Sequence, residues 1–276
     1  VRNWDDPRMP TISGLRRKGY PPNAIKEFIY SLGIGKSDGY SSIEHLEYFV
    51  RKELNQISNR AMAVLNPIKL IIDNYEENSS EVLEAKNNPE DENSGSRKIH
   101  FSKELYIEKD DFMEDAPKKY FRLSIGKEVR LLHAYYVTCA HIEKDENGLI
   151  KEVHCTYDPD TKGGWSKDGR KVKGTIHWVS AKHSIDAKVR VYKKLFVKSN
   201  PYDCKDGGTY IDNLNQDSLN NINNVKLEAS LDNCSTDNYY QFVRKGYFKK
   251  DKDSSKKDLI FNQIVNLRDS WKKHTK

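Results

Sequence analysis

The stretch Ile142-Glu143-Lys144-Asp145-Glu146-Asn147-Gly148-Leu149-Ile150 decides the fold class of this chain. Asn-Gly between two runs of alternating apolar and polar residues is a strong signal for a β-hairpin. Similar alternation, with β-branched and aromatic residues, recurs in four other segments, at 61–65, 105–108, 129–137 and 189–196. Many short strands separated by turns favour barrels over a parallel sheet, so the chain after Asn59 is predicted to be mainly β.

The first 58 residues have a helical pattern instead. A first short helix over 11–19 begins at a Thr cap and ends at a Gly. A second over 21–33 begins at a Pro-Pro pair, which suits the first helical positions. Ser41 and Glu44 form a plausible capping box for a third helix. An N-terminal α-helical subdomain is therefore predicted.

Three polar segments are predicted to be exposed loops. The segment 76–97 is rich in Glu, Asn and Ser, so it buries too little apolar surface to offset its ordering entropy. We expect this segment to be partly mobile. The run 251–257 and the Asn-rich run near Asn220 are similar but shorter.

Length and charge set broad limits on function. A chain of 276 residues can hold two or three compact units. Lys and Arg number 47 against 41 Asp and Glu, and the resulting charge of +6 favours an anionic partner only weakly. No apolar run approaches the ~20 residues of a membrane span, and the first residues form no targeting signal. We therefore expect a cytoplasmic protein with no membrane partner.

The cysteines give little support for a metal site or a disulfide framework. No Cys-x-x-Cys pair occurs among Cys139, Cys155, Cys204 and Cys234, so reduced thiols are expected. One alternative is that Cys139 and His141 meet His154 or Cys155 across the hairpin and bind a metal. Four converging ligands are rarer than buried Cys and solvated His, and the sequence marks no residue that would orient such ligands. The sequence thus predicts no metal site.

Catalytic motifs are absent from the sequence. It contains no phosphate-binding Gly-x-x-x-x-Gly-Lys, no Gly-x-Ser-x-Gly and no His-x-x-x-His pair. His-x-Gly-His and Met-Ser-Lys are also missing. Asp5 and Asp6 are adjacent carboxylates, and adjacent side chains point apart, so capping or solvation is expected. No catalytic residue is predicted in this chain.

Three groups of residues carry a resemblance to class I aminoacyl-tRNA synthetases. The segment that follows the second ATP-binding signature of glutaminyl- and glutamyl-tRNA synthetases resembles the first group, Trp4-Asp5-Asp6-Pro7-Arg8-Met9-Pro10-Thr11-Ile12-Ser13-Gly14-Leu15-Arg16-Arg17. The segments that resemble the glutaminyl family more closely are 60–64 with Pro67 and Lys69, and 126–131. The match continues through 169–174 and 176–180 to 266–271.

This resemblance implies a division of the chain. Residues 1–58 would form a helical, tRNA-contacting subdomain, 59–100 with 186–276 a proximal β-barrel, and 101–185 a distal β-barrel. Both barrels would be antiparallel, of the six-stranded type, and would bind the anticodon. The catalytic domain of the family precedes such residues and binds ATP and Mg²⁺. The chain would then recognise tRNA(Gln), would not bind DNA and would be a monomer. Alone it would be unable to attach glutamine to that tRNA.

The resemblance also assigns roles to single residues. Arg60 and Gln241 correspond to readers of the middle anticodon base, where an amide can both donate to and accept from a uracil edge. Arg122 corresponds to the reader of the third base, a guanine, whose acceptor atoms suit a guanidinium. Arg130 corresponds to the reader of the first base and would accept either pyrimidine by donating to O2.

Other residues of this pattern contact the tRNA backbone or depart from the family. Lys36 and Arg244 correspond to backbone-binding positions, which hold phosphates without reading sequence. Lys119, a further candidate at the anticodon, stands where Gln is usual, Phe121 where a basic residue is usual, and Leu132 where a second Arg occurs. These departures affect the contacts expected at the first and third bases.

Two alternatives stay open at this point. The first motif is shared with glutamyl-tRNA synthetases, so the C-terminal region of such an enzyme is one alternative. A non-catalytic RNA-binding module is the other, because unrelated RNA-binding proteins use similar barrels.

Overall fold

The computed structural model describes residues 1–35, 39 and 41–268. The chain forms two compact units. The first comprises Val1–Asn59, Lys188–Asn223 and, as far as it is described, Ser235–Lys276, and the second comprises Arg60–Ala187 and Asn224–Cys234. In the described part of the chain, no helix has both the length and the apolar character needed to cross a membrane.

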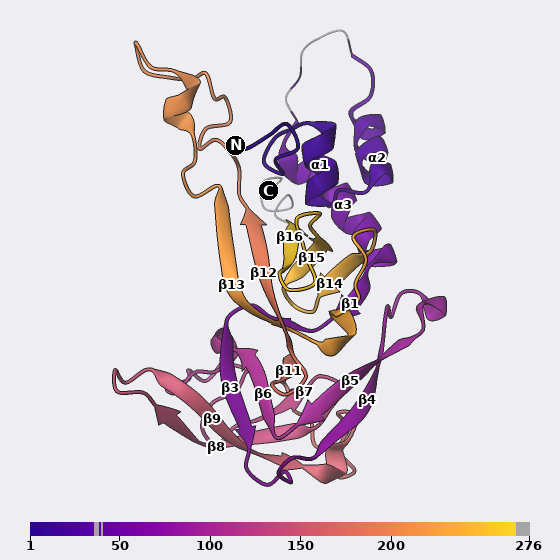
Figure 1. Ribbon diagram of the computed structural model, residues 1–276, viewed down its shortest axis with the longest axis vertical. Coiled ribbons are helices and arrows are strands. Elements are labelled where there is room, and N and C mark those ends of the chain that lie inside the picture. The colour runs from indigo at the N-terminus through magenta and orange to yellow at the C-terminus, as the bar shows by residue number, and fades with distance from the viewer. Residues whose placement is uncertain (36–38, 40, 269–276) are drawn as a thin grey trace. The chain divides into compact units, whose positions relative to one another are not determined.

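The α-helices described in the first unit are α1 (Ile12–Lys18), α2 (Pro22–Leu32) and α3 (Ile43–Ile57) (Figure 1). Thr11 Oγ1 accepts a hydrogen bond from the Gly14 N–H at 2.9 Å, and Gly19 ends α1 with a φ of 106°. Gly19 tolerates this left-handed conformation because it has no Cβ. The predicted helices over 11–19 and 21–33 are therefore confirmed.

The start of α3 differs from the prediction by one residue. Ser42, not Ser41, is the N-cap, and its Oγ accepts a hydrogen bond from the His45 N–H at 3.3 Å. With this cap the third helical position is His45, so Glu44 cannot complete the predicted capping box. Glu44 instead lies in the first turn, where a negative charge interacts favourably with the helix dipole.

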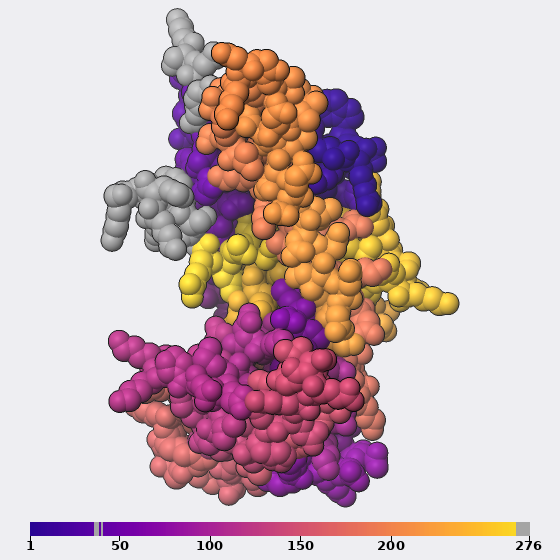
Figure 2. All heavy atoms as spheres, turned by 90° about the vertical axis from the view of Figure 1, so that its left-hand side faces the viewer, coloured from indigo at the N-terminus to yellow at the C-terminus, as the bar shows by residue number. Residues whose placement is uncertain are grey.

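The sheet of the first unit contains β14 (Tyr239–Phe242), β15 (Gly246–Lys250), β16 (Leu259–Val265), β12 (Ile185–Tyr192) and β13 (Leu219–Leu227), in that order. Figure 1 shows β12 and β13 side by side, and the segment 193–218 that joins them contributes to the orange spheres in the upper part of Figure 2. The predicted loop near Asn220 is wrong, since this run lies in β13. Strand pairing uses the backbone, which polar side chains do not prevent.

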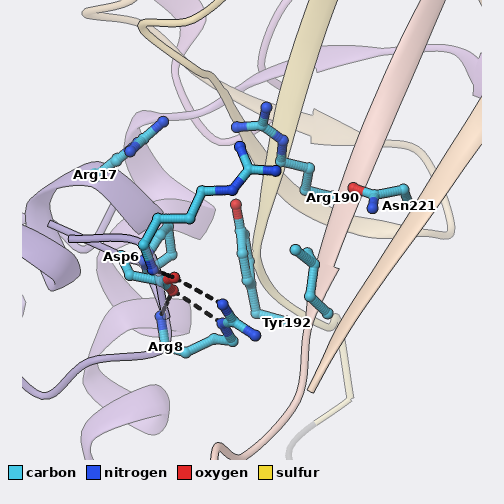
Figure 3. Close-up of a pocket in the computed structure, with 9 residues that line it drawn as sticks. Asp6, Arg8, Arg17, Arg190, Tyr192 and Asn221 are labelled. Carbon is cyan, nitrogen blue, oxygen red and sulfur yellow. Dashed lines mark hydrogen bonds and ion pairs between the residues drawn. The ribbon is translucent and has the colours of Figure 1, made fainter. Parts of the chain in front are cut away.

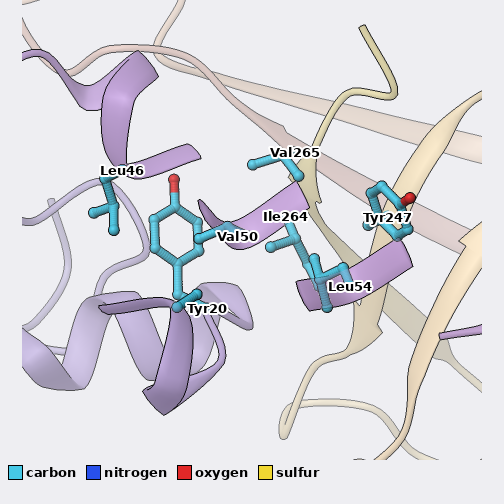
Figure 4. Packing of buried hydrophobic residues seen from close by; sticks show 8 residues of the cluster. Tyr20, Leu46, Val50, Leu54, Tyr247, Ile264 and Val265 are labelled. Carbon is cyan, nitrogen blue, oxygen red and sulfur yellow. The ribbon is translucent and has the colours of Figure 1, made fainter. Parts of the chain in front are cut away.

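The core of the first unit joins the helices to the C-terminal strands. Val50 and Leu54, one turn apart on α3, are fully buried with Tyr20, Tyr247 and Ile264 (Figure 4). Fully burying an aliphatic side chain of this size contributes about 1.5–3 kcal/mol. The helices are therefore held in place by strands that come about 200 residues later in the sequence.

The second unit is built mainly from short strands. These are β2 (Ala63–Val64), β3 (Pro67–Ile72), β4 (Ser80–Lys86), β5 (Ser96–Ser102), β6 (Glu104–Glu108), β7 (Glu128–Leu131), β8 (Tyr136–Lys144), β9 (Ile150–Asp158), β10 (Thr175–Ile176) and β11 (Trp178–Ser180). Seven of the described strands form a barrel-like sheet in the order β10-β7-β8-β9-β3-β6-β11. The predicted mainly β, barrel-containing fold is confirmed, with two parallel pairings, β10 with β7 and β3 with β9, among the antiparallel ones.

The predicted exposed loop over 76–97 is wrong. Its middle part forms β4 and its last two residues begin β5, an antiparallel pair in which Leu83 lies opposite Ile99. Leu83, Ala85, Ile99 and Phe101 are all buried. The abundant polar residues occupy the alternate, outward positions, so their number conceals a continuous apolar face.

The predicted barrel boundaries stay a prediction. The strand order places residues 59–61 and 63–64 in the sheet of β12 to β16, in line with that prediction. Residues 60–100 nevertheless belong to the second unit together with 101–187. The physical reason is the pairing of β3, whose Leu70 lies opposite Leu105 of β6 and Val153 of β9. The strand β1 (Asn59–Ala61) links the two units along the chain, as do β12 and β13.

Candidate nucleic-acid interface

Gln241 is held by neighbours within the first unit. It lies on β14 opposite Tyr247 of β15, and its Nε2 donates to Tyr247 Oη at 2.9 Å. Tyr247 Oη in turn donates to Asn55 Oδ1 of α3 at 3.2 Å. Tyr240 and Phe242 are buried while Gln241 is half-buried, which confirms the predicted alternation of faces along β14. The amide is thus oriented, and its oxygen and second N–H remain able to meet a ligand.

Arg122 lies in the segment between β6 and β7 of the second unit. Its Nη1 donates to the Asp110 carbonyl oxygen at 2.9 Å and lies 3.2 Å from Asp111 Oδ1. Asp111 is buried, whereas 42% of the Arg122 side chain is exposed. One edge of the guanidinium is therefore anchored, and the exposed remainder can donate outward. Lys119 is exposed nearby in the sequence.

Arg130 projects from β7 onto a glycine turn. Its Nε donates to Thr175 Oγ1 at 3.1 Å, and its Nη1 donates to the Gly164 carbonyl oxygen at 3.2 Å. Gly164 has a φ of 83°, and a Cβ there would lie 2.6 Å from Arg130 Cδ. The guanidinium carbon lies 6.0 Å from the ring centroid of Trp165, which is 77% exposed. A cation beside an exposed aromatic ring suits stacking with a base.

A second exposed aromatic lies beside this site. Phe121 is 54% exposed, and Lys173 Nζ lies 5.3 Å from its ring centroid. A backbone hydrogen bond links Lys173 to Arg130, because the Arg130 N–H donates at 2.9 Å to the carbonyl oxygen of Gly174, the residue after Lys173. We call Phe121, Arg130, Trp165 and Lys173 the Arg130 face. The sequence interpretation did not select Trp165 or Lys173, although Gly163-Gly164-Trp165 marks a turn that presents a Trp.

The remaining predicted residues are placed as follows. Arg60 is half-buried on β1 and belongs to the second unit, whereas Gln241 belongs to the first. Arg244 is exposed in the turn between β14 and β15 with a φ of 67°. Leu132 is half-buried, and its carbonyl oxygen accepts from Trp178 Nε1 at 3.0 Å. Lys36 lies outside the described residues.

A pocket of the first unit is lined by several arginines (Figure 3). Arg8 Nη2 and Nε donate to the two carboxylate oxygens of Asp6 at 2.7 and 2.9 Å. Burial opposes ionisation of Asp6, but these bonds and the backbone N–H of Arg8 hold its pKa well below its usual value. Arg17 similarly lies 3.2 Å from Asp5 and 3.1 Å from Asp251. Asp5 and Asp6 therefore form ion pairs, which the sequence did not predict. Asp6 also accepts the backbone N–H groups of Arg2 and Arg8, so the predicted capping holds for this residue.

Known families match nearly the whole chain. Residues 58–158 and 175–251 match two models described as tRNA synthetases class I (E and Q), anti-codon binding domain. Residues 1–56 match the catalytic domain of the same synthetases. The prediction that the helical residues stand apart from the catalytic domain is therefore corrected. The helices α1 to α3 fall almost entirely within the catalytic-domain match.

Individual relatives agree with this assignment. The chain is 47% identical over 273 residues to a glutamine–tRNA ligase of Bradyrhizobium diazoefficiens, covering 99% of the chain and 48% of the relative. It is 48% identical over 275 residues to that of Clostridium perfringens, with 99% and 49% covered. For that of Vibrio parahaemolyticus the identity is 46% over 274 residues, again with 99% and 49% covered. The chain spans about half the length of these curated relatives. It belongs to the class I (E and Q) tRNA synthetases, and most of it consists of their anticodon-binding domains.

Proposed function

We propose that this chain reads the anticodon of tRNA(Gln) as part of a ligase that attaches glutamine to that tRNA. The observation that carries the proposal is 46–48% identity, across 99% of the chain, to relatives named glutamine–tRNA ligase. ATP and Mg²⁺ would be bound by the part of the catalytic domain that these residues do not include. The ligase would act in the cytoplasm as a monomer.

The middle anticodon base is assigned to Gln241 and Arg60. An amide with one N–H held by Tyr247 has a fixed orientation, so its oxygen presents an acceptor and its second N–H a donor in a defined geometry. A uracil edge offers the complementary acceptor and donor. Single-stranded bases are typically recognised through such edge contacts. Arg60 would add a charged donor to the same base.

The third and first bases are assigned to Arg122 and Arg130. The contacts of Arg122 with Asp110 and Asp111 orient a guanidinium whose remaining donors suit the O6 and N7 acceptors of guanine. Arg130, held by Thr175 and Gly164, would donate to the O2 shared by cytosine and uracil. Lys119 is a further candidate contact at these bases.

Two positions are assigned to the tRNA backbone. Exposed Arg244, in the turn after the strand that carries Gln241, would contact a phosphate near the middle base. Lys36 would contact phosphates elsewhere on the tRNA. Contacts of this type add affinity and salt dependence but carry no sequence information.

Binding and aminoacylation test the proposal separately. The chain alone should bind tRNA(Gln) more tightly than tRNA(Glu), and substitution of the middle anticodon base should weaken the binding. The full-length protein should charge tRNA(Gln) with glutamine and not with glutamate. Equal binding of both tRNAs, or charging with glutamate, would contradict the proposal and favour the glutamyl enzyme. Binding without any charging by the full-length protein would favour a non-catalytic RNA-binding module.

A further inference from the structure

Two histidines and two glutamates share the solvent-accessible face of the β8–β9 hairpin. In the strand register His141 lies opposite His154, and Glu143 lies opposite Glu152. Because residues two apart on a strand point to the same side, the four side chains form one patch. The rings of His141 and His154 stack with their centroids 4.3 Å apart.

The ring of His154 has a fixed orientation. Its Nδ1 lies 2.8 Å from Asp73 Oδ1, while Nε2 is buried and has no hydrogen-bond partner in the described structure. Asp73 follows β3 directly, and its own N–H donates to the Cys155 carbonyl oxygen at 2.8 Å. An Nδ1–H that donates to a carboxylate leaves the Nε2 lone pair free. This is how proteins typically orient a metal-binding histidine.

Carboxylate oxygens lie on the Nε2 side of the His154 ring. Glu143 Oε1 is 3.7 Å and Glu152 Oε2 is 3.9 Å from Nε2. Around tetrahedral zinc, with bonds of about 2.0–2.2 Å, ligand atoms lie about 3.4 Å apart. The Glu143 side chain is 52% exposed, so it can close the difference by a small rotation. The other oxygen of Glu152, Oε1, lies 3.7 Å from Lys69 Nζ, which leaves Oε2 for the ion.

We propose that Glu143, Glu152 and His154 bind one Zn²⁺ ion, with Asp73 orienting the histidine and water completing the coordination. Two carboxylates neutralise the ion, and the imidazole favours zinc over magnesium or calcium. The bound ion would join β8 to β9 at this end of the hairpin.

This ligand set differs from the alternative metal site considered in the sequence, in which Cys139 and His141 meet His154 or Cys155. Cys139 and Cys155 are buried in the barrel interior, so they do not reach this face. The group that orients His154 is Asp73, which the hairpin sequence did not reveal, because it follows β3 and is brought to His154 by the parallel pairing of β3 with β9.

Zinc binding by the purified chain tests the inference. After chelator treatment, titration calorimetry with ZnCl₂ should give one ion per chain. Co²⁺ in place of zinc should give the visible absorption of a tetrahedral site. Glu143→Gln, Glu152→Gln and His154→Gln should each lower the affinity at least ~10-fold, and Asp73→Asn should lower it roughly 10- to 100-fold. Unchanged circular dichroism would show that each variant is folded, and half-exposed Glu143 is the variant least able to disturb the fold.

A second histidine pair provides a matched control. His100 and His183 also stack, at 4.4 Å, and His183 Nε2 is also buried without a partner in the described structure. No potential metal-binding group of three among the described residues includes either of them. His183→Gln should therefore leave the zinc affinity unchanged. Unaltered affinity in the Glu143 and Glu152 variants, equal loss in His183→Gln, or loss only in His141→Gln would each overturn the proposal.

Discussion

Tyr247 accepts a hydrogen bond from Gln241 Nε2 on the opposite strand and donates one from its own hydroxyl to Asn55 Oδ1 on α3. This chain of hydrogen bonds connects a candidate base reader to a helix of the same unit. Tyr247→Phe keeps the ring but removes both the acceptor for Gln241 and the donor to Asn55, so the double variant with Gln241→Ala is needed to separate the two effects.

We expect Tyr247→Phe to weaken binding of tRNA(Gln) by about 0.5–1.5 kcal/mol, the typical worth of one hydrogen bond. In a Gln241→Ala background the same change should have little further effect, because the amide to be oriented is gone. Equilibrium binding of the two single variants and the double variant measures this coupling. Tyr239→Phe, on β14 with Gln241, is the control and should be neutral. Additive losses in the double variant would show that Tyr247 acts independently of Gln241.

Arg122→Ala should remove a charged donor from the third anticodon base. A good bidentate base contact is worth about 1–3 kcal/mol of discrimination, so binding of the cognate tRNA should weaken markedly. The affinity for a tRNA already changed at that base should fall little on Arg122→Ala, because the contact is missing in either protein. Arg244→Ala and Lys36→Ala should weaken both tRNAs alike and reduce the salt dependence of binding. Equal weakening of both tRNAs by Arg122→Ala would make it only an electrostatic contact.

Gly163 and Gly164 provide a paired test of the Arg130 face. Both have positive φ, 82° and 83°, so alanine costs about 1–2 kcal/mol of backbone strain at either position. Only at Gly164 would the new Cβ collide with Arg130, since nothing lies within 4 Å at Gly163. Gly164→Ala should therefore reduce tRNA(Gln) affinity well beyond Gly163→Ala at similar thermal stability. Equal affinities of the two variants would show that the position of Arg130 does not matter.

The ion pair of Arg97 with Glu228 should matter for stability. Only 9% and 4% of the two side chains are exposed, and Glu228 Oε2 also accepts the Met62 N–H at 2.9 Å. Glu228→Ala leaves a buried guanidinium and a buried N–H without that partner, so we expect a loss of about 3–5 kcal/mol in unfolding free energy. Glu77→Ala breaks an exposed pair with Lys103 and should cost at most about 1 kcal/mol. Urea unfolding compares the two, and similar losses would contradict the prediction.

Acid stability should depend on Asp251. Burial disfavours its charged form, yet hydrogen bonds from Arg17, the Asp253 N–H and Asn262 lower its pKa below the ordinary 3.8. A carboxyl with a lowered folded-state pKa stabilises the protein above its unfolded pKa, and this stability is lost as the pH falls through the folded pKa. Asp251→Asn should be less stable at pH 7 but lose less on acidification below about pH 4. Parallel loss in both proteins, measured by urea unfolding at stepped pH, would show that other groups control acid unfolding.

Local signals explain what the sequence could predict of the fold. The Thr11 cap, Gly19 and the Asn147-Gly148 turn each act over a few residues, and each occurs as predicted. The hairpin of β4 and β5 was missed because its polar outward residues outnumber the buried face that includes Leu83 and Phe101. Composition averages the two faces, whereas a strand separates them.

The contacts of the candidate tRNA-binding residues were likewise beyond prediction from the sequence. The residues that orient Gln241, Arg122 and Arg130 could not be predicted, because partners such as Tyr247 and Thr175 reach them only through strand pairing and turns. The candidate zinc ligands likewise come together from β8 and β9, and Asp73, which orients His154, follows β3. Register, which single-sequence patterns do not fix, decides these contacts.

The core shared by α3 and β16 has a consequence for synthesis on the ribosome. Leu54 and Ile264 pack together but lie about 210 residues apart in the chain. At about 5–20 residues per second, the apolar side of α3 would wait roughly 10 to 40 s for its partner strand to be made. During that time the ribosome makes the second unit, residues 60–187 and, later, 224–234, before it makes β16. The apolar side of the nascent helix is exposed during that time, so we expect translation rate and chaperone supply to influence the yield of folded protein.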